Sequence, residues 1–191
     1  MIPRFVCDML TIVRGNSILR GEKCMTEIFA KPAVGAIIEK IECGKRYILI
    51  QERQKENGGI ENGMTEIPAG KIREYENIFD ALRREVWEET GLKLTKIQGE
   101  EKLYSSQYNG YKTLSFLPFC VTQNVSGGYS IILQTFICEA AGELQLETNE
   151  TRNIRWEAVA SVEKMLAEKP EHFYPLHINA LKKYFAEYPS K

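Results

Sequence analysis

The sequence has no excess of charge of either sign. Its 25 lysine and arginine residues nearly balance its 26 aspartate and glutamate residues, which gives a formal net charge of −1 at pH 7. A chain without an overall field of one sign does not recruit nucleic acid or an anionic membrane surface by long-range electrostatics. We therefore expect neither nucleic acid nor a membrane as a partner. Any polyanion must be recognised at a local site.

The sequence also lacks paired cysteines and long apolar stretches. Its five cysteines are widely scattered, with no Cys-x-x-Cys pair and no histidine at metal-ligand spacing. This pattern favours free thiols in a reducing compartment. No stretch approaches the roughly 20 apolar residues needed to span a bilayer. The fairly apolar start is interrupted by Arg4 and Asp8, and no small-residue cleavage site follows it. We expect a soluble, cytoplasmic protein.

Length and hydrophobic patterning predict one α/β domain over residues 1–191. Alternating or short apolar runs predict strands at 33–38, 46–51, 114–121, 130–139 and 154–158. The stretch 53–63 is rich in charge, Asn and Gly, which is typical of a surface hairpin loop.

Helices are predicted between and after these strands. In 77–90, apolar residues recur at four-residue spacing, Asn77 can serve as N-cap, and Gly91 is the expected stop. Two further helices are predicted at 161–169, where Pro170 ends the pattern, and at 175–188.

Three carboxylates lie where helix physics disfavours them. Glu85, Glu88 and Glu89 stand at i, i+3 and i+4, so they should share one helix face and repel each other. They also lie in the last two turns, where the helix dipole disfavours each anion by about 0.3 to 1 kcal/mol. A bound Mg²⁺ or Mn²⁺ would remove both penalties. The alternative is a solvated acidic face on which Arg84 pairs with Glu88.

These glutamates belong to a longer spaced pattern. It comprises Gly70, Glu76, Arg84-Glu85-Val86, Glu88-Glu89 and Gly91-Leu92. The pattern resembles the Nudix hydrolase signature at every fixed position. That resemblance implies a Nudix-like αβα sandwich with a mixed β-sheet. It also implies Mg²⁺-dependent or Mn²⁺-dependent hydrolysis of a nucleoside diphosphate linked to another moiety, by attack of water at phosphorus.

The resemblance also implies roles for individual residues. The metal ligands would be Glu85, Glu88 and Glu89, together with the backbone carbonyl of Ala69. Of these glutamates, Glu85 and Glu89 are the strongest catalytic candidates. The orienting arginine of the family corresponds to Arg84, and Glu76 is the acidic neighbour expected to pair with it. A glycine at position 70 would leave the backbone open to the metal or a phosphate.

The general base is left open by the sequence. In the ADP-ribose branch of the family, an acidic residue commonly follows a Ser-Pro-Gly loop, whereas here Tyr129 follows Ser126-Gly127-Gly128. The remaining candidates are a glutamate of the signature and the loop residues Glu147 and Glu150, although acidic loop residues are usually only solvated.

Two motifs indicate different substrates. The run Glu66-Ile67-Pro68-Ala69-Gly70 resembles the approach to the signature in ADP-ribose and sugar-nucleotide pyrophosphatases. Tyr108 stands where those enzymes tend to carry proline, and tyrosine there resembles the dinucleoside polyphosphate hydrolases. We therefore treat Tyr108 as a candidate substrate-binding residue. Alternatives are a dinucleoside polyphosphate hydrolase and a non-catalytic nucleotide-binding regulator with a Nudix fold.

Two further expectations concern assembly and the histidines. Enzymes of the ADP-ribose type are commonly dimers that share an N-terminal strand region, so residues 1–30 are expected to build a homodimer interface. No Ser or Cys is placed to form a triad with His172 or His177, and we expect structural or surface roles for both.

Overall fold

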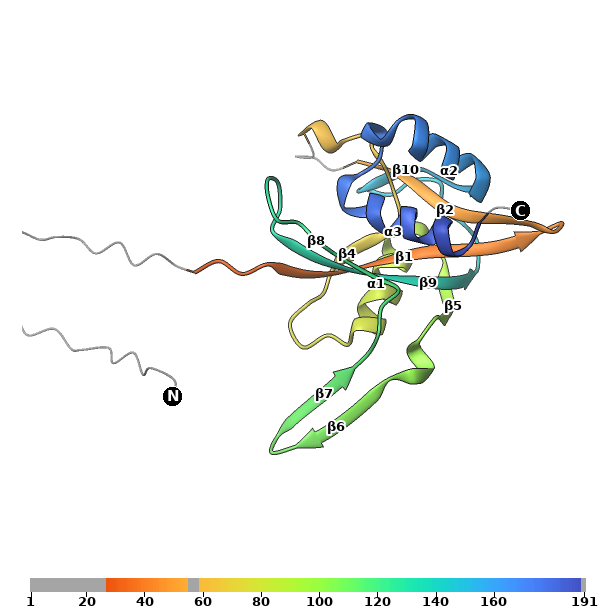
Figure 1. The fold of residues 1–191 in the computed structure, drawn as a ribbon. Helices are drawn as coiled ribbons and strands as arrows, with labels where there is room; N and C mark the ends of the chain where they lie inside the picture. Colours follow the sequence, from red (N-terminus) through yellow and green to blue (C-terminus); the bar gives the residue numbers. More distant parts are fainter. Residues whose placement is uncertain (1–26, 55–58, 190–191) are drawn as a thin grey trace, which may run out of the picture.

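The computed structural model describes residues 27–54 and 59–189. In these ranges a mixed sheet of eight strands forms the body, and a separate two-stranded hairpin projects from it (Figure 1). The strands of the main sheet are β1 Lys31–Glu42, β2 Lys45–Arg53, β3 Thr65–Glu66, β4 Ala69–Lys71, β5 Lys93–Ile97, β8 Cys120–Gln123, β9 Ile131–Ala141 and β10 Thr151–Ala158. The hairpin consists of β6 Tyr104–Tyr108 and β7 Tyr111–Ser115. The α-helices of the described residues are α1 Ile78–Thr90, α2 Val159–Glu168 and α3 Pro175–Glu187.

The main sheet has the strand order β10-β2-β1-β9-β5, with β3 paired to β2, β4 to β1 and β8 to β9. Strands β1 and β9 run parallel, and the other pairings of this sheet are antiparallel. The turn between β1 and β2 consists of Cys43 and Gly44, whose φ angles are 50° and 76°. Two consecutive positive φ angles match the type I′ turn, whose twist suits a two-residue hairpin.

Helices cover both faces of the sheet, which makes the fold an αβα sandwich (Figure 1). Alternate residues of β1 point to opposite faces, because side chains alternate along a strand. Val34, Ala36 and Ile38 belong to the hydrophobic cluster that includes α1. Ile37 belongs to the cluster on the other face, which includes residues of α2 and α3. The predicted fold class is thus confirmed.

The predicted helices are confirmed, with small shifts of their ends. Asn77 caps α1, since its side-chain oxygen accepts a hydrogen bond from the backbone of Phe79 at 2.9 Å. Gly91 ends the helix in the left-handed region at φ 74°. Helix α2 begins at Val159, two residues before the predicted start, and α3 covers Pro175–Glu187.

The predicted strand at 114–121 is wrong. The chain leaves β7 at Ser115 and enters β8 only at Cys120. Pro118 lies in the break, where its missing N–H removes no ladder hydrogen bond. Strands β3 to β6 were not predicted, because β3 and β4 are too short to show a period and β6 is exposed along its whole length.

Two predictions fall partly outside the described residues. The segment expected to build a dimer interface, 1–30, lies there except for residues 27–30. The predicted 53–63 loop does join two antiparallel strands, β2 and β3, although residues 55–58 are not described.

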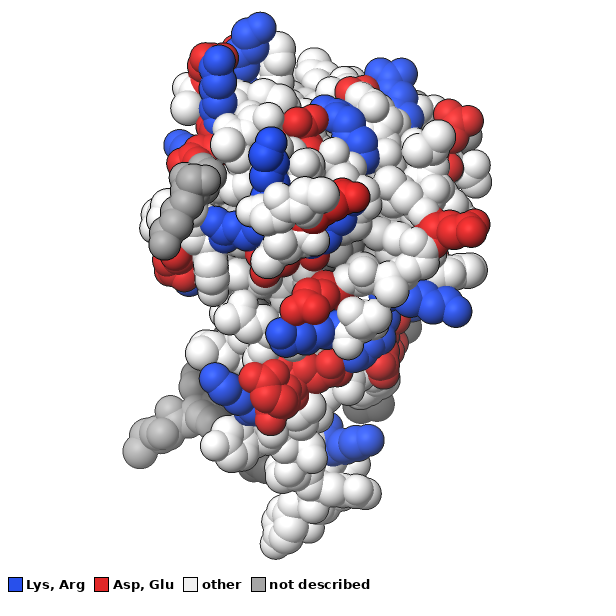
Figure 2. All heavy atoms as spheres, turned by 90° about the vertical axis from the view of Figure 1, so that its right-hand side faces the viewer, with Lys and Arg blue, Asp and Glu red and all other residues white. Residues whose placement is uncertain are grey.

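Charge and hydropathy of the described residues agree with the near-neutral composition. On the face shown in Figure 2, lysine and arginine side chains lie among aspartate and glutamate side chains. In the described part of the chain, no helix has the length and apolar character needed to cross a membrane.

Candidate active site

A pocket of about 420 Å³ lies beside the C-terminal half of α1. One part of its wall is charged and includes Glu85 and Glu88 of α1, together with Arg73 and Lys71. Another part is apolar and comes from β1, β9 and the start of α3. Its members are Ala33, Ile131, Leu133 and Leu176. The pocket therefore offers a charged surface and an apolar surface to one ligand.

Arg84 organises the charged wall. Its guanidinium donates two hydrogen bonds to Glu76, at 2.7 and 2.8 Å, in a bidentate pair. The same group reaches Glu85 at 2.6 Å and Glu88 at 3.2 Å, and it donates to the carbonyl of Lys71 at 3.1 Å. The hydrogen bonds from Arg84 lower the pKa of Glu76 to about 2. One arginine thus fixes the 71–76 loop and two glutamates of α1 relative to each other.

Gly70 and Glu85 lie in direct contact across the pocket wall. A Cβ atom built on Gly70 would overlap the carboxyl group of Glu85. Burial raises the pKa of Glu85, and the charges of Glu88 and Glu150 add to that rise against the opposing effect of Arg84. A side chain at position 70 would therefore force the Glu85 carboxyl group to move, and no positive φ angle is involved.

Glu89 faces the interior of the protein. Only 5 % of the residue is exposed, and its Oε2 accepts hydrogen bonds from Gln51 Nε2 at 2.8 Å and from the backbone N–H of Ala69 at 3.0 Å. Burial raises the pKa of Glu89 to about 8. The three signature glutamates therefore do not share one environment, since Glu85 and Glu88 line the pocket while Glu89 ties α1 to β2 and β4.

The segment from Glu66 to Gly70 is held from both faces of the sheet. On the α1 side, Glu89 accepts the N–H of Ala69. On the α3 side, Nδ1 of His177 accepts the N–H of Ile67 at 3.2 Å. The Glu66–Gly70 segment therefore couples the two helix layers at the edge of the pocket.

The NUDIX domain family model matches residues 30–177. The chain belongs to the Nudix hydrolase family. This is a family of pyrophosphohydrolases, and the protein is an enzyme of that class. No curated relative matches the sequence.

Solved structures share the fold at low sequence identity. A MutT protein from Methanosarcina mazei is 21% identical, with a TM-score of 0.54 over 86% of this chain and 99% of that chain. A Nudix hydrolase from Nitrosomonas europaea is 22% identical, with a TM-score of 0.53 over 83% and 90%. The Nudix domain of Shewanella oneidensis NrtR, complexed with ADP-ribose, is 13% identical, with a TM-score of 0.57 over 88% and 94%.

The donor groups of the Nudix signature suit a hard divalent cation. Glu85 and Glu88 present carboxylate oxygens to the pocket, and Mg²⁺ and Mn²⁺ prefer such oxygen ligands. Behind them, Oε1 of Gln51 is buried next to Glu89 and has no hydrogen-bond partner in the described part of the protein. Among the described residues, no three acidic, His or Cys side chains lie close enough together to hold an ion. Arg84 bonds to Oε1 of Glu85 and to Oε2 of Glu88, so it holds both carboxylates at the pocket wall.

The two candidate loop bases occupy different positions. Glu150 lines the pocket, and its backbone carbonyl accepts a hydrogen bond from Gln54 at 2.7 Å. Glu147 is exposed and is not part of the pocket wall. The structure therefore brings Glu150, and not Glu147, to the charged wall.

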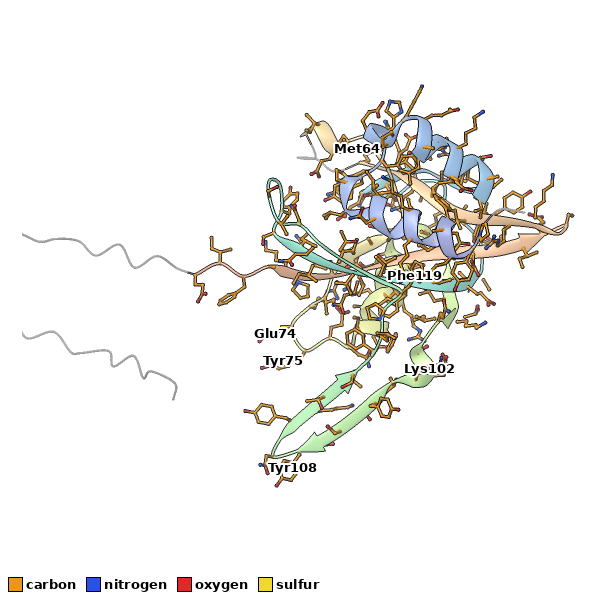
Figure 3. The ribbon with its side chains drawn as sticks, viewed as in Figure 1. Met64, Glu74, Tyr75, Lys102, Tyr108 and Phe119 are labelled. Carbon is orange, nitrogen blue, oxygen red and sulfur yellow. The ribbon has the colours of Figure 1, made fainter. Side chains whose placement is uncertain are left out.

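Tyr108 lies outside the pocket. It ends β6 at the turn of the projecting hairpin, and 78% of the residue is exposed (Figure 3). Within the described ranges, β6 and β7 pair only with each other, so this turn lies away from the main sheet. The structure thus does not bring Tyr108 to the other candidate site residues.

Sequence reasoning missed several pocket residues, and three of them lie outside the Nudix signature and carry polar side chains. Arg53, Tyr174 and His177 line the pocket but come from β2 and from the segment around the start of α3. His177 was expected to have a structural or surface role. No local signal marks these residues, because chain segments far apart in the sequence bring them together.

Proposed function

We propose that this Nudix hydrolase cleaves a nucleoside diphosphate linked to another moiety, of the ADP-ribose or sugar-nucleotide type. The observation that carries the proposal is the pocket itself, which joins the glutamates of the Nudix signature to an apolar wall. A substrate with a charged pyrophosphate and a less polar flanking group matches both surfaces.

Residues of the charged wall bind and orient the pyrophosphate. Glu85 and Glu88 would hold the cation, which when bound neutralises phosphate charge and lowers the pKa of bound water. Arg73 and Lys71 line the same wall and offer positive charge to phosphate oxygens. Arg84 positions Glu85 and Glu88 rather than contacting the reacting atoms.

Glu150 is the proposed general base. It lies at the pocket on a loop, in the position from which a side chain can reach a water molecule near the phosphate. The water oxygen forms a new bond to phosphorus and its proton passes to Glu150. The anhydride P–O bond breaks, and the products are a nucleoside monophosphate and the phosphorylated second moiety.

The motif around Gly70 and one structural relative support this substrate class. The Glu66–Gly70 run resembles the ADP-ribose and sugar-nucleotide branch, and the NrtR Nudix domain is a protein complexed with ADP-ribose. The dinucleoside polyphosphate alternative rested on Tyr108, which lies away from the pocket. A non-catalytic regulator is disfavoured by the presence of Glu150 at the charged wall.

A substrate panel tests the proposal. The purified protein is incubated with Mg²⁺ and with ADP-ribose, sugar nucleotides, dinucleoside polyphosphates and NADH, and the products are separated by chromatography. We expect release of a nucleoside monophosphate, fastest from ADP-ribose or a sugar nucleotide. Binding of these compounds without turnover would contradict the proposal and favour a regulator.

The homodimer with residues 1–30 at its interface is also a proposal. It rests on the resemblance to the ADP-ribose branch alone, since residues 1–26 lie outside the described part of the chain. Light scattering at micromolar concentration tests it. A strictly monomeric mass would rule the dimer out.

A further inference from the structure

Arg53, Tyr174 and His177 form a polar part of the pocket wall that the proposed chemistry does not use, and we call it the Arg53–His177 wall. His177 is 1% exposed and lies in the first turn of α3. Its Nδ1 accepts the backbone N–H of Ile67 at 3.2 Å. A neutral imidazole that accepts at Nδ1 must carry its proton on Nε2. The tautomer of His177 is thus fixed by the backbone.

The remaining nitrogen of His177 is a hydrogen-bond donor that has no protein acceptor among the described residues. Among the described residues, the only side-chain hydrogen bond of His177 is the one at Nδ1. The residue lines the pocket, where a bound molecule can supply the acceptor for Nε2–H. Burial also lowers the pKa of His177 to about 3, which keeps the ring neutral at ordinary pH. A fixed donor at a ligand pocket selects for an acceptor atom.

The charge of the Arg53–His177 wall argues against a phosphate at this position. The Arg53 guanidinium is 4.4 Å from the centre of the Tyr174 ring, and it pairs with Glu66 at 3.1 Å and Glu61 at 3.3 Å. One cation faces two carboxylates, so the positive charge of Arg53 is already compensated. An anion brought to this wall would gain little attraction and would meet two like charges.

The other neighbours favour a flat, weakly polar group. The ring of Tyr174 packs edge-on against His177, with 5.2 Å between ring centres, and the backbone N–H of Tyr174 is held by the carbonyl of Thr65. Leu133 and Leu176 line the same pocket. Aromatic and aliphatic side chains with one fixed donor suit a planar ring that carries a hydrogen-bond acceptor.

We propose that His177 is a specificity-determining residue whose Nε2–H donates a hydrogen bond to an acceptor atom of the nucleobase of the substrate. The base lies against Tyr174 and the apolar wall, while the phosphates lie at the Nudix signature. The inference rests on the proposed function for the identity of the substrate, but it concerns binding rather than hydrolysis.

Binding of product-like probes tests the inference separately from catalysis. Calorimetry with AMP, GMP, CMP and UMP is compared with ribose 5-phosphate, which has the same phosphate and sugar but no base. At least one nucleotide should bind the wild-type protein about tenfold or more tightly than ribose 5-phosphate. Equal binding of all five compounds would overturn the inference, even if the substrate panel shows turnover.

Two variants of His177 distinguish the acceptor role of Nδ1 from the donor role of Nε2. In His177→Asn, the side-chain oxygen can still accept the N–H of Ile67, but no donor reaches the position of Nε2. In His177→Gln, the amide N–H can reach that position. We expect His177→Asn to lose most of the nucleotide preference over ribose 5-phosphate and His177→Gln to keep more of it. His172→Asn is the matched control, because His172 is exposed and lies outside the pocket wall.

Other outcomes would contradict the inference. If His177→Asn still prefers nucleotides to ribose 5-phosphate, another group recognises the base. An equal loss of affinity for nucleotides and ribose 5-phosphate would place the donor against phosphate. If His177→Asn does not fold, the test is wild-type binding of nucleotides in which one ring nitrogen is replaced by carbon or one carbonyl oxygen is removed. One such replacement should cost about tenfold, and no effect at any ring nitrogen or carbonyl position would overturn the role of His177.

Discussion

Arg84 holds the residues of the charged wall in position through five hydrogen bonds. Its bidentate pair with Glu76 and its bonds to Glu85, Glu88 and the Lys71 carbonyl require a planar group with several fixed donors. Lysine offers a single compact charge and cannot make the bidentate pair. The position of Glu85 therefore depends on arginine and not only on positive charge.

We predict that Arg84→Lys lowers kcat by about tenfold to a hundredfold, the range found when a partner of a metal ligand is removed. Steady-state kinetics at saturating Mg²⁺ measures this effect, and a thermal melt shows whether the fold is kept. The exposed pair Lys164–Glu168 provides a control, because Lys164→Arg should change nothing. Unchanged kcat in Arg84→Lys would contradict the positioning role.

We predict that Gly70→Ala lowers kcat more than it lowers the stability of the fold. The added Cβ overlaps the Glu85 carboxyl group, which must rotate away from the pocket wall. Gly35→Ala is the matched control on the adjacent strand, where the new Cβ meets Ala69 and Leu133 at 3.4 Å. We expect kcat to fall by at least about tenfold only in Gly70→Ala. Equal effects of the two substitutions would show that the Glu85 contact is not the cause.

Glu89 makes the metal-free protein sensitive to pH in a defined direction. Its pKa rises from 4.5 to about 8 on folding because of burial, so the folded state keeps a proton that the unfolded state releases. The contribution of Glu89 to stability is therefore full below about pH 4.5. It is lost as the pH rises from there through about 8.

Urea unfolding in EDTA measures this effect for the wild type and for Glu89→Gln, which has no titrating group at this position. Between pH 5 and 8, the wild type should lose stability relative to the variant by up to about 1.4 kcal/mol per pH unit. His177 also titrates differently in the two states, but it is common to both proteins. Parallel stability curves would contradict the burial of an ionisable Glu89.

At the scale of secondary structure, the hairpin β6–β7 differs from the rest of the fold. No residue of either strand is buried, and the two strands pair only with each other. A two-stranded hairpin without a packed face is marginally stable in water. One face carries Tyr104, Tyr108 and Tyr111 without a charged residue, and all three are exposed.

Hydrogen exchange should separate this hairpin from the main sheet. We expect amides of β6 and β7 to exchange orders of magnitude faster than those of β1 and β9, because local opening of the hairpin exposes little apolar surface. Mass spectrometry of peptides covering 104–115 and 131–141 measures the difference. Protection of the hairpin equal to that of β9 would contradict this account and would mean that a partner covers it.

Elements with local signals were predictable from the sequence, and elements without them were not. Helix α1 has a capping residue, apolar spacing and a stop glycine within one short segment. Strands β6 and β7 bury nothing and so have no apolar period. The Asn109-Gly110 turn, with φ angles of 49° and 81°, is the one local signal that could have indicated this hairpin.

The same distinction holds for the site. The Nudix signature is a local pattern, and three of its residues, Glu76, Glu85 and Glu88, bond to Arg84 in the structure. The inward position of Glu89 depends on Gln51 and Ala69, and the pocket position of His177 depends on Ile67. These contacts join distant parts of the chain. Sequence patterning within one element cannot predict them.

At the scale of the whole molecule, the sandwich places the two walls of the pocket on different layers. Helix α1 supplies Glu85 and Glu88 from one face of the sheet, and α3 supplies Leu176 and His177 from the other. The Glu66–Gly70 segment connects these layers through Glu89 and His177. The fold thus brings the charged wall and the apolar wall to one cavity.

Mg²⁺-dependent release of nucleoside monophosphate by the wild type and by Glu85→Gln tests the central claim most directly. The substitution keeps the size of the side chain and removes the charge that the proposed cation needs. With the best substrate of the panel, we predict that the wild type turns over only with Mg²⁺ or Mn²⁺ and that Glu85→Gln lowers kcat at least about a hundredfold with its fold intact. Equal turnover by the two proteins, or turnover by the wild type in EDTA, would contradict hydrolysis at this site.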